Sequence, residues 1–296
     1  LTPDTIQRVM YSIATQQQRE RFEETLELDF SYALPDVARF RVNLYRQRDS
    51  LGAAFRVIPF EIKSLESLGM PPAMANFAAL PRGFVLVTGP TGSGKSTTLA
   101  ALVDMANRTR AEHIMTVEDP IEFLHRNKNC LFNQREVGSD TYGFKNALRS
   151  VLRQDPDVVL VGEMRDYETF EAAIRAAETG HLVFGTIHAS SAWQTFGRIY
   201  DLFPENEREQ LRKLLAYNLR AIIYQKLLKT LHKDIARIPA LEILLNTPAV
   251  QKYILEAREG ELLQIIKQSH GATHLACFIL IHLHWRNIKN NTKHCG

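Results

Sequence analysis

The spacing of apolar residues changes several times along the chain, and each change predicts a different element. Between residues 4 and 24 apolar side chains recur at helical spacing, which predicts a helix. The period then becomes two, so a strand is predicted whose apolar and polar side chains face opposite ways. The apolar face holds Phe40, Val42 and Leu44, and the polar face holds Arg39, Arg41 and Asn43. Residues 49–52 are typical of a turn, and a second strand is predicted through Phe55 and Val57.

Past a connector, short apolar runs alternate with helical segments, which is the rhythm of a parallel sheet. The predicted strands cover residues 84–88, 113–118, 157–161 and 182–187. Further predicted elements are a helix over 205–230, a strand over 240–245 and a helix over 248–257. The pattern divides the chain into a small α+β unit (1–62), a linker (63–72), an α/β domain (73–270) and an atypical tail (271–296).

Composition narrows the class of protein without naming a function. The 296 residues are 45% hydrophobic and 23% charged, as in ordinary globular proteins, and the net charge of +3 is too small to favour a nucleic-acid partner. Three scattered cysteines predict a reducing compartment and neither a disulfide framework nor a C-x-x-C metal site. No segment is long and apolar enough to predict a transmembrane helix. Because the chain starts at Leu1, we expect a trimmed sequence.

Residues 89–98, GPTGSGKSTT, fit the pattern G-x-x-x-x-G-K-[ST], between a predicted strand and a predicted helix. Glycines let such a loop curl so that its N–H groups point at phosphate oxygens, and the helix start adds a positive dipole end. Lys95 can reach the β- and γ-phosphates, and the Ser96 hydroxyl can bind Mg²⁺. The predicted ligands are therefore ATP and Mg²⁺. The predicted nucleotide-binding residues are Gly89, Pro90, Thr91, Gly92, Ser93, Gly94, Lys95, Ser96 and Thr97.

Acidic or imidazole side chains follow three more of the predicted strands, where ligands of α/β sheets bind. The first group, in TVEDPIE, holds the carboxylates of Glu118, Asp119 and Glu122, one of which could orient and deprotonate an attacking water. The second is Glu163, which follows the strand DVVLV where a carboxylate helps to hold Mg²⁺. The third stretch runs from His181, just before the strand over 182–187, to His188, just after it; a His after a buried strand could bond the γ-phosphate and sense its loss. Taken singly, each group also fits an exposed turn or a structural histidine.

Together the segments GPTGSGKSTT, TVEDPIE, LRQDPDVVLVGEMRD and AAETGHLVFGTIHASSA resemble the four boxes of the type II/type IV secretion ATPase superfamily. The match is closest to its pilus-retraction branch, the PilT-like twitching motility ATPases. The resemblance runs from about residue 10 to about residue 268. It implies a RecA-like P-loop ATPase domain preceded by a PAS-like domain, here lacking its first strand.

The resemblance also implies roles for matching residues. Glu122 corresponds to the catalytic glutamate of the Asp box, Glu163 to the Walker B glutamate, and His181 and His188 to the His box. Gly162, which replaces the aspartate of the general P-loop pattern, is normal in this family. The small domain of the family supplies arginines to the nucleotide. The candidates here are Arg39, Arg41 and Arg56, with Arg198 in addition; a solvated strand face is the alternative.

The implied function is a cytoplasmic, hexameric ATPase motor of the type IV pilus. It would associate peripherally with the inner membrane, act on a pilus platform protein there, and drive retraction. Residues 249–256 keep the frame of a retraction-branch helix motif but lack its arginines, so pilus extension or type II secretion stays open. The absence of paired C-x-x-C sites favours retraction. A DNA translocase and a regulator that only binds nucleotide are the alternatives from other classes.

Overall fold

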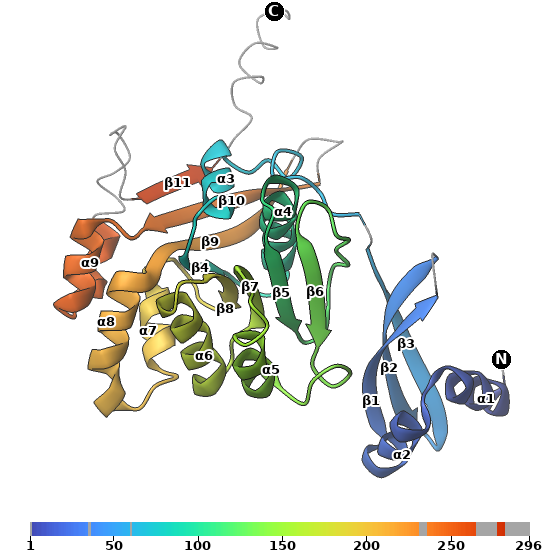
Figure 1. Cartoon of the computed structure of the whole chain (residues 1–296). Helices are drawn as coiled ribbons and strands as arrows, with labels where there is room; N and C mark the ends of the chain where they lie inside the picture. Colours follow the sequence, from blue (N-terminus) through green and yellow to red (C-terminus); the bar gives the residue numbers. More distant parts are fainter. Residues whose placement is uncertain (1, 35–36, 60, 231–235, 265–276, 282–296) are drawn as a thin grey trace, which may run out of the picture.

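The computed structural model describes residues 2–34, 37–59, 61–230, 236–264 and 277–281, arranged as a small N-terminal unit beside a larger α/β domain (Figure 1). The N-terminal unit is a three-stranded antiparallel sheet, in the order β1-β2-β3, with two helices packed against it. Its elements are α1 (Pro3–Ile13), α2 (Gln16–Thr25), β1 (Glu27–Leu34), β2 (Ala38–Gln47) and β3 (Ser50–Ile58).

The alternation predicted for the first strand is present in β2. Val42 and Leu44 are buried with Phe22 of α2 in a core of their own, whereas Arg41 on the other face is exposed. The single helix predicted over 4–24 is wrong, because Thr15 caps a new helix by a reciprocal pair of hydrogen bonds with Gln18. This capping box was missed in the sequence.

The turn of the β2–β3 hairpin lies earlier than predicted. Arg48 and Asp49 form it with φ of 49° and 60°, the left-handed geometry that suits a two-residue hairpin. Strand β3 therefore begins at Ser50, inside the predicted turn over 49–52. The register of the hairpin pairs Arg41 directly with Arg56.

The larger domain is built on an eight-stranded sheet in the order β11-β10-β9-β4-β8-β7-β5-β6, which is parallel from β9 to β6 and antiparallel at β10 and β11. Strand β8 separates the phosphate-loop strand β4 from β7. The strands are β4 (Gly83–Thr88), β5 (His113–Glu118), β6 (Leu131–Glu136), β7 (Val158–Glu163), β8 (Leu182–Ile187), β9 (Leu219–Lys229), β10 (Arg237–Leu245) and β11 (Cys277–Ile281).

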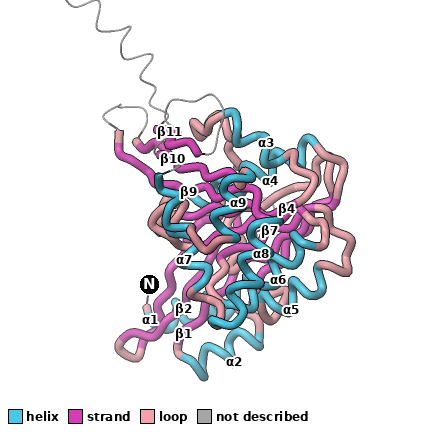
Figure 2. The backbone as a smooth tube through the Cα atoms, turned by 90° about the vertical axis from the view of Figure 1, so that its left-hand side faces the viewer, coloured by secondary structure: helices cyan, strands magenta, loops and turns pink. Residues whose placement is uncertain are grey.

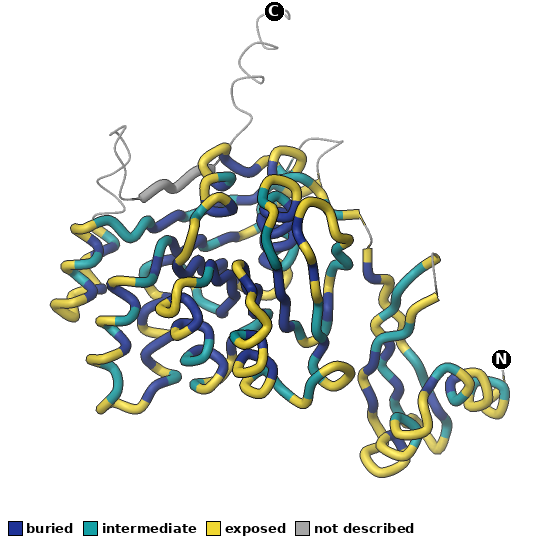
Figure 3. The backbone as a smooth tube through the Cα atoms, viewed as in Figure 1, coloured by how far each residue is buried: buried dark blue, intermediate teal, exposed yellow. Residues whose placement is uncertain are grey.

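Helices cover both faces of this sheet, and the two views of the backbone show the layers (Figures 1 and 2). One face is covered by α5 (Phe144–Val151), α6 (Tyr167–Glu178), α7 (Gln194–Tyr200), α8 (Arg208–Asn218) and α9 (Pro248–Leu255). The other is covered by α3 (Ala75–Ala78) and α4 (Lys95–Thr109). Short 3-10 turns complete the described elements: η1 (Pro72–Met74), η2 (Glu205–Glu207) and η3 (Glu259–Glu261). Burial is densest in the central strands (Figure 3).

The helix predicted over 205–230 is wrong beyond Asn218. There the chain turns extended and runs as β9 alongside β4, so that Ala221, Ile222 and Ile223 are buried on the sheet. The apolar residues here have helical spacing, but pairing with β4 makes the segment a strand, because tertiary contacts often override a local preference. Strands β1 and β6 were not predicted.

Part of the predicted atypical tail is a strand. Residues 277–281 form β11, which pairs antiparallel with β10 at the edge of the sheet. The rest of the tail lies outside the described residues. The domain limits given above stay a prediction. Among the described residues between Ile58 and Pro72, which include the predicted linker, no helix or strand occurs. Within those same described segments, no helix has the length and apolar character needed to cross a bilayer.

We expect Phe184→Ala to lower the free energy of unfolding by about 3–5 kcal/mol, because the ring is fully buried on β8 and its loss leaves a cavity. Urea denaturation followed by circular dichroism would measure this change. Tyr142→Ala, at a position 96% exposed, is the control and should change stability by less than about 0.5 kcal/mol. Equal midpoints for the two variants would contradict the central position given to β8.

Candidate active site

The loop after β4 has the shape that the glycine pattern predicted. Gly89, Gly92 and Gly94 have φ of 145°, 74° and 86°, a region that side-chain-bearing residues rarely adopt. At Gly89 a Cβ atom would also lie 2.2 Å from the backbone oxygen of Gln225, so only glycine fits there. The loop leads directly into α4, whose first residue is Lys95. Its N–H groups and the helix start form a concave anion-binding surface.

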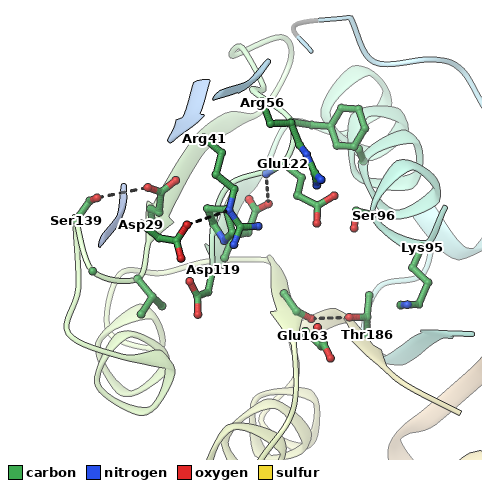
Figure 4. A pocket seen from close by; sticks show the side chains of 18 of the residues that line it. Asp29, Arg41, Arg56, Lys95, Ser96, Asp119, Glu122, Ser139, Glu163 and Thr186 are labelled. Carbon is green, nitrogen blue, oxygen red and sulfur yellow. Dashed lines mark hydrogen bonds and ion pairs between the residues drawn. The ribbon is translucent and has the colours of Figure 1, made fainter. Parts of the chain in front are cut away.

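Lys95, at the start of α4, is 9% exposed, and its side chain reaches back to the loop. Its ammonium donates hydrogen bonds to the carbonyl oxygens of Gly89 (3.0 Å) and Pro90 (3.1 Å). Burial lowers the pKa of Lys95, and the carboxylates of Glu163 and Glu122 act in the opposite direction. A concentrated positive charge is therefore held where both acidic segments converge (Figure 4).

Gln225, on β9, fixes the loop from behind and was missed in the sequence. Its side chain is 2% exposed and accepts a hydrogen bond from Thr98 Oγ1 (2.7 Å) while donating one to the backbone oxygen of Ser93 (2.7 Å). These bonds join the sheet, the loop and the first turn of α4. Because β9 was predicted as helix, no sequence signal placed Gln225 beside the loop.

Glu163 and His188 meet at the ends of β7 and β8. The imidazole Nε2 of His188 donates to Glu163 at 2.8 Å, and its Nδ1 lies 3.5 Å from the ammonium of Lys95. Burial alone would raise the pKa of Glu163, but a 2.7 Å hydrogen bond from Arg165 and the nearby His188 and Lys95 lower it overall. Glu163 is therefore ionised at neutral pH, within a chain of polar contacts that reaches the loop.

The other acidic segment, at the end of β5, enters the same cleft. Glu118 is desolvated, which raises its pKa, although it accepts hydrogen bonds from Thr116 and Gln134. Glu122 is exposed and lies across the cleft from Ser96 (Figure 4). Of these carboxylates, Glu122 has the open position that a water-activating group needs.

The N-terminal unit closes the other side of this cleft, whose volume is ≈ 1290 Å³. Arg41 and Arg56, paired across β2 and β3, line it together with Lys95 and Ser96 of the larger domain (Figure 4). Arg41 lies 3.9 Å from Asp29 and stays largely exposed. Two guanidinium groups of one unit thus share a cleft with the phosphate loop of the other.

The structure does not bring the remaining predicted residues into this cleft. Arg39 is engaged by Glu136, to which it donates a 3.1 Å hydrogen bond. His181 precedes β8, at the end opposite His188, and its Nδ1 contacts the backbone oxygen of Ala176. Arg198, on α7, lines a neighbouring hollow together with Gly89, Pro90 and His188.

These features define the class. A glycine loop with a buried lysine, acidic groups at the ends of neighbouring parallel strands and a strand between β4 and β7 make this domain a RecA-like P-loop nucleoside triphosphatase. A family model described as "Type II/IV secretion system protein" matches residues 39–283, and the chain belongs to that family of ATPases.

Individual relatives are similar over most of the chain. The type IV pilus retraction ATPase PilT of Pseudomonas aeruginosa is 50% identical over 262 residues, which are 88% of this chain and 76% of the relative. A twitching motility protein of Neisseria gonorrhoeae is 50% identical over 265 residues, 90% of this chain and 70% of its own length. The crystal structure of the pilus retraction motor PilT with bound ADP matches with a TM-score of 0.86 and 46% identity, covering 90% of this chain and 78% of the other.

We expect Gln225→Leu to weaken nucleotide binding about tenfold. The substitution leaves the Thr98 hydroxyl and the Ser93 carbonyl without their partner, a cost of about 1–2 kcal/mol. Titration with a fluorescent ATP analogue would measure the change. Gln251→Leu, on α9, is the matched control and should bind as the wild type does. Wild-type affinity in Gln225→Leu would show that the loop keeps its shape without this side chain.

A pH effect should come from His125, on the segment after Glu122. Its ring stacks on Phe132 with centroids 4.3 Å apart, and its Nδ1 is buried without a hydrogen-bond partner among the described residues. Burial lowers the pKa of His125 to about 4. The unfolded chain therefore takes up this proton below about pH 6.5 and the folded chain only near pH 4, so stability falls on acidification across that window.

His125→Phe should remove this component and keep the stacking. Between pH 7 and pH 4 the wild type should lose about 3 kcal/mol more unfolding free energy than the variant. Urea denaturation at several pH values measures both curves. Parallel curves would mean that His125 is protonated equally well in the folded and unfolded chain.

Proposed function

We propose that this chain is an ATP-hydrolysing motor of the type IV pilus machinery that drives pilus retraction. The proposal rests mainly on four side chains that converge at the carboxyl ends of parallel strands: Lys95, Glu122, Glu163 and His188. In addition, the chain is 50% identical over 262 residues to a pilus retraction ATPase. The cleft contains the groups that hydrolysis requires. Lys95 is a cation for the phosphates, Glu122 a base for the attacking water, and His188 a side chain placed to detect the γ-phosphate.

In the proposed reaction, the loop N–H groups and Lys95 bind the β- and γ-phosphates of ATP. Glu122 takes a proton from the attacking water, which adds to the γ-phosphorus in line with the departing ADP oxygen. His188, which is hydrogen-bonded to Glu163 and close to Lys95, is placed to respond when the γ-phosphate leaves. Arg41 and Arg56 neutralise charge that develops on the phosphoryl oxygens.

Mg²⁺ fits the donor set of the cleft. The Ser96 hydroxyl and the carboxylate of Glu163 are oxygen donors of the kind that Mg²⁺ prefers, and both line the cleft beside Lys95 (Figure 4). We propose these two residues as its protein partners, the first directly and the second directly or through water. When bound with ATP, the ion would offset the negative charge of the β- and γ-phosphates.

Retraction is favoured over pilus extension or type II secretion by sequence and similarity together. The extension and secretion branches often carry paired C-x-x-C metal sites, whereas the three cysteines of this chain are far apart. Both a pilus retraction ATPase and a twitching motility protein match 88–90% of the chain. A DNA translocase has no comparable support, since the net charge is only +3.

We further propose the setting in which the motor works. A homohexamer in the cytoplasm, bound peripherally at the inner membrane, would pass the relative motion of its two domains to a pilus platform protein. The proposed domains are residues 1–62 and 73–270, joined by a linker over 63–72. No nucleic-acid partner is proposed, in line with the small net charge of +3.

Two substitutions test the proposed chemistry. Lys95→Ala should weaken ATP binding and nearly abolish hydrolysis, because the charge on the phosphates is lost. Glu122→Gln should keep ATP binding but lower kcat by about 10²–10⁴, the usual cost of removing a general base. Phosphate release at saturating ATP, with and without DNA, gives the rates, and Glu209→Gln, at an exposed position of α8, is the control.

Wild-type turnover in either variant would exclude the assigned role of that residue, and strong stimulation by DNA would favour the translocase. For retraction, a host strain whose own copy is replaced by the Lys95→Ala gene should become hyperpiliated and lose twitching. A strain with few pili would instead point to extension.

A further inference from the structure

Glu136 is a buried carboxylate that the proposed reaction does not use. It ends β6, beside Glu118 of β5 in the sheet, and is 3% exposed. The sequence motifs assigned no function to Glu136, and the reaction proposed for the cleft does not require it. Its hydrogen bonds, however, reach two parts of the protein that the proposed reaction requires to act together.

One set of bonds comes from the N-terminal unit. Arg39 Nη2 donates to Glu136 Oε2 at 3.1 Å, and the hydroxyl of Ser31 donates to Oε1 at 2.7 Å. Arg39 also donates to Ser31 at 2.9 Å, so the two side chains hold each other in place. Among the described residues, Arg39 provides the one ion pair that Glu136 makes.

The other set holds the catalytic segment. The backbone N–H of Ile121 donates to the same oxygen of Glu136, Oε2, at 3.1 Å. Ile121 is itself buried, and the next residue is Glu122, which is exposed in the cleft. The N–H of Glu122 donates a longer bond, 3.4 Å, to Glu118, and on its other side the carbonyl of Phe123 accepts one of 2.9 Å from Gln134.

We propose that Glu136 is a positioning residue that ties the placement of Glu122 to the docking of the N-terminal unit. The inference rests on the proposed role of Glu122 as the base. A buried carboxylate is strongly disfavoured without a counter-charge, so the position of Glu136 depends on Arg39. When the N-terminal unit is docked, Oε2 is fixed and holds the Ile121 N–H; when the unit moves away, the carboxylate turns to water and releases Glu122.

The consequence is that hydrolysis is confined to the docked arrangement. Arg41 lies on β2 with Arg39 and Arg56 lies on the neighbouring β3, so both enter the cleft only when the N-terminal unit is in place. Docking of the N-terminal unit therefore places Arg41 and Arg56 in the cleft and orients Glu122 at the same time. Arg39, predicted as a ligand of the nucleotide, acts instead through the protein.

The test compares two arginines on the same strand with equal ion-pair distances. Arg39→Gln breaks the 3.1 Å pair with Glu136 between the units, and Arg46→Gln, the control, breaks a 3.1 Å pair with Glu23 inside the N-terminal unit. Arg39→Gln should lower kcat about tenfold with ATP affinity changed less than twofold. Arg46→Gln should leave both at wild-type values. Full kcat in Arg39→Gln, or a loss confined to ATP affinity, would overturn the proposal.

A second comparison separates positioning from general damage. In a Glu122→Gln background there is no base left to orient, so Arg39→Gln should cause no further loss of kcat. An equal tenfold loss in both backgrounds would show that Arg39 acts independently of Glu122. Ser31→Ala removes one neutral bond and should lower kcat about two- to threefold. If Arg39→Gln does not fold, the wild-type kcat of a well-folded Ser31→Ala would itself overturn the proposal.

The same measurements distinguish this inference from the proposed function. If wild-type protein does not hydrolyse ATP, or if Glu122→Gln is fully active, the function assigned to the cleft is wrong. If the wild type is active and Glu122→Gln is impaired while Arg39→Gln is unaffected, only the coupling through Glu136 is wrong.

Discussion

The structure of this site depends on a lysine ammonium held out of water at the end of a parallel sheet. Lys95 can lie there because the loop glycines turn the carbonyls of Gly89 and Pro90 toward it, and because the carboxylates of Glu163 and Glu122 lie near enough to offset part of its desolvation. A buried cation without such partners would be costly. The glycine geometry, the acidic strand ends and the position of His188 all follow from accommodating this charge.

The same requirement for compensated charge explains how two units form one site. The N-terminal unit has its own small core, and it meets the larger domain through polar side chains: Arg39 and Ser31 on Glu136, with Arg41 and Arg56 facing the cleft. Polar contacts of this kind re-form readily after separation, because each group can be hydrated when the units part. An interface like this suits domains that move relative to each other.

The sequence predicted the parts of the fold and site that depend on local patterns. The glycine loop, the four central strands and the alternation along β2 are all present, because each depends on residues close together in the chain. Gln225 and Glu136 could not be predicted in this way. They act through contacts with residues far along the chain, Thr98 for Gln225 and Arg39 for Glu136, and Gln225 lies on a strand whose local spacing is helical. The separation of His181 from His188 likewise follows from strand direction, which motif matching does not provide.

In the proposed reaction, one cleft formed by both units of a single chain holds the triphosphate. A crystal structure with a non-hydrolysable ATP analogue and Mg²⁺ would test it most directly. We expect the ammonium of Lys95 to bond the β- and γ-phosphate oxygens, with Arg41 or Arg56 of the same chain within hydrogen-bonding distance of the triphosphate. Phosphates bound at the loop with both of these arginines turned away from the nucleotide would contradict the claim.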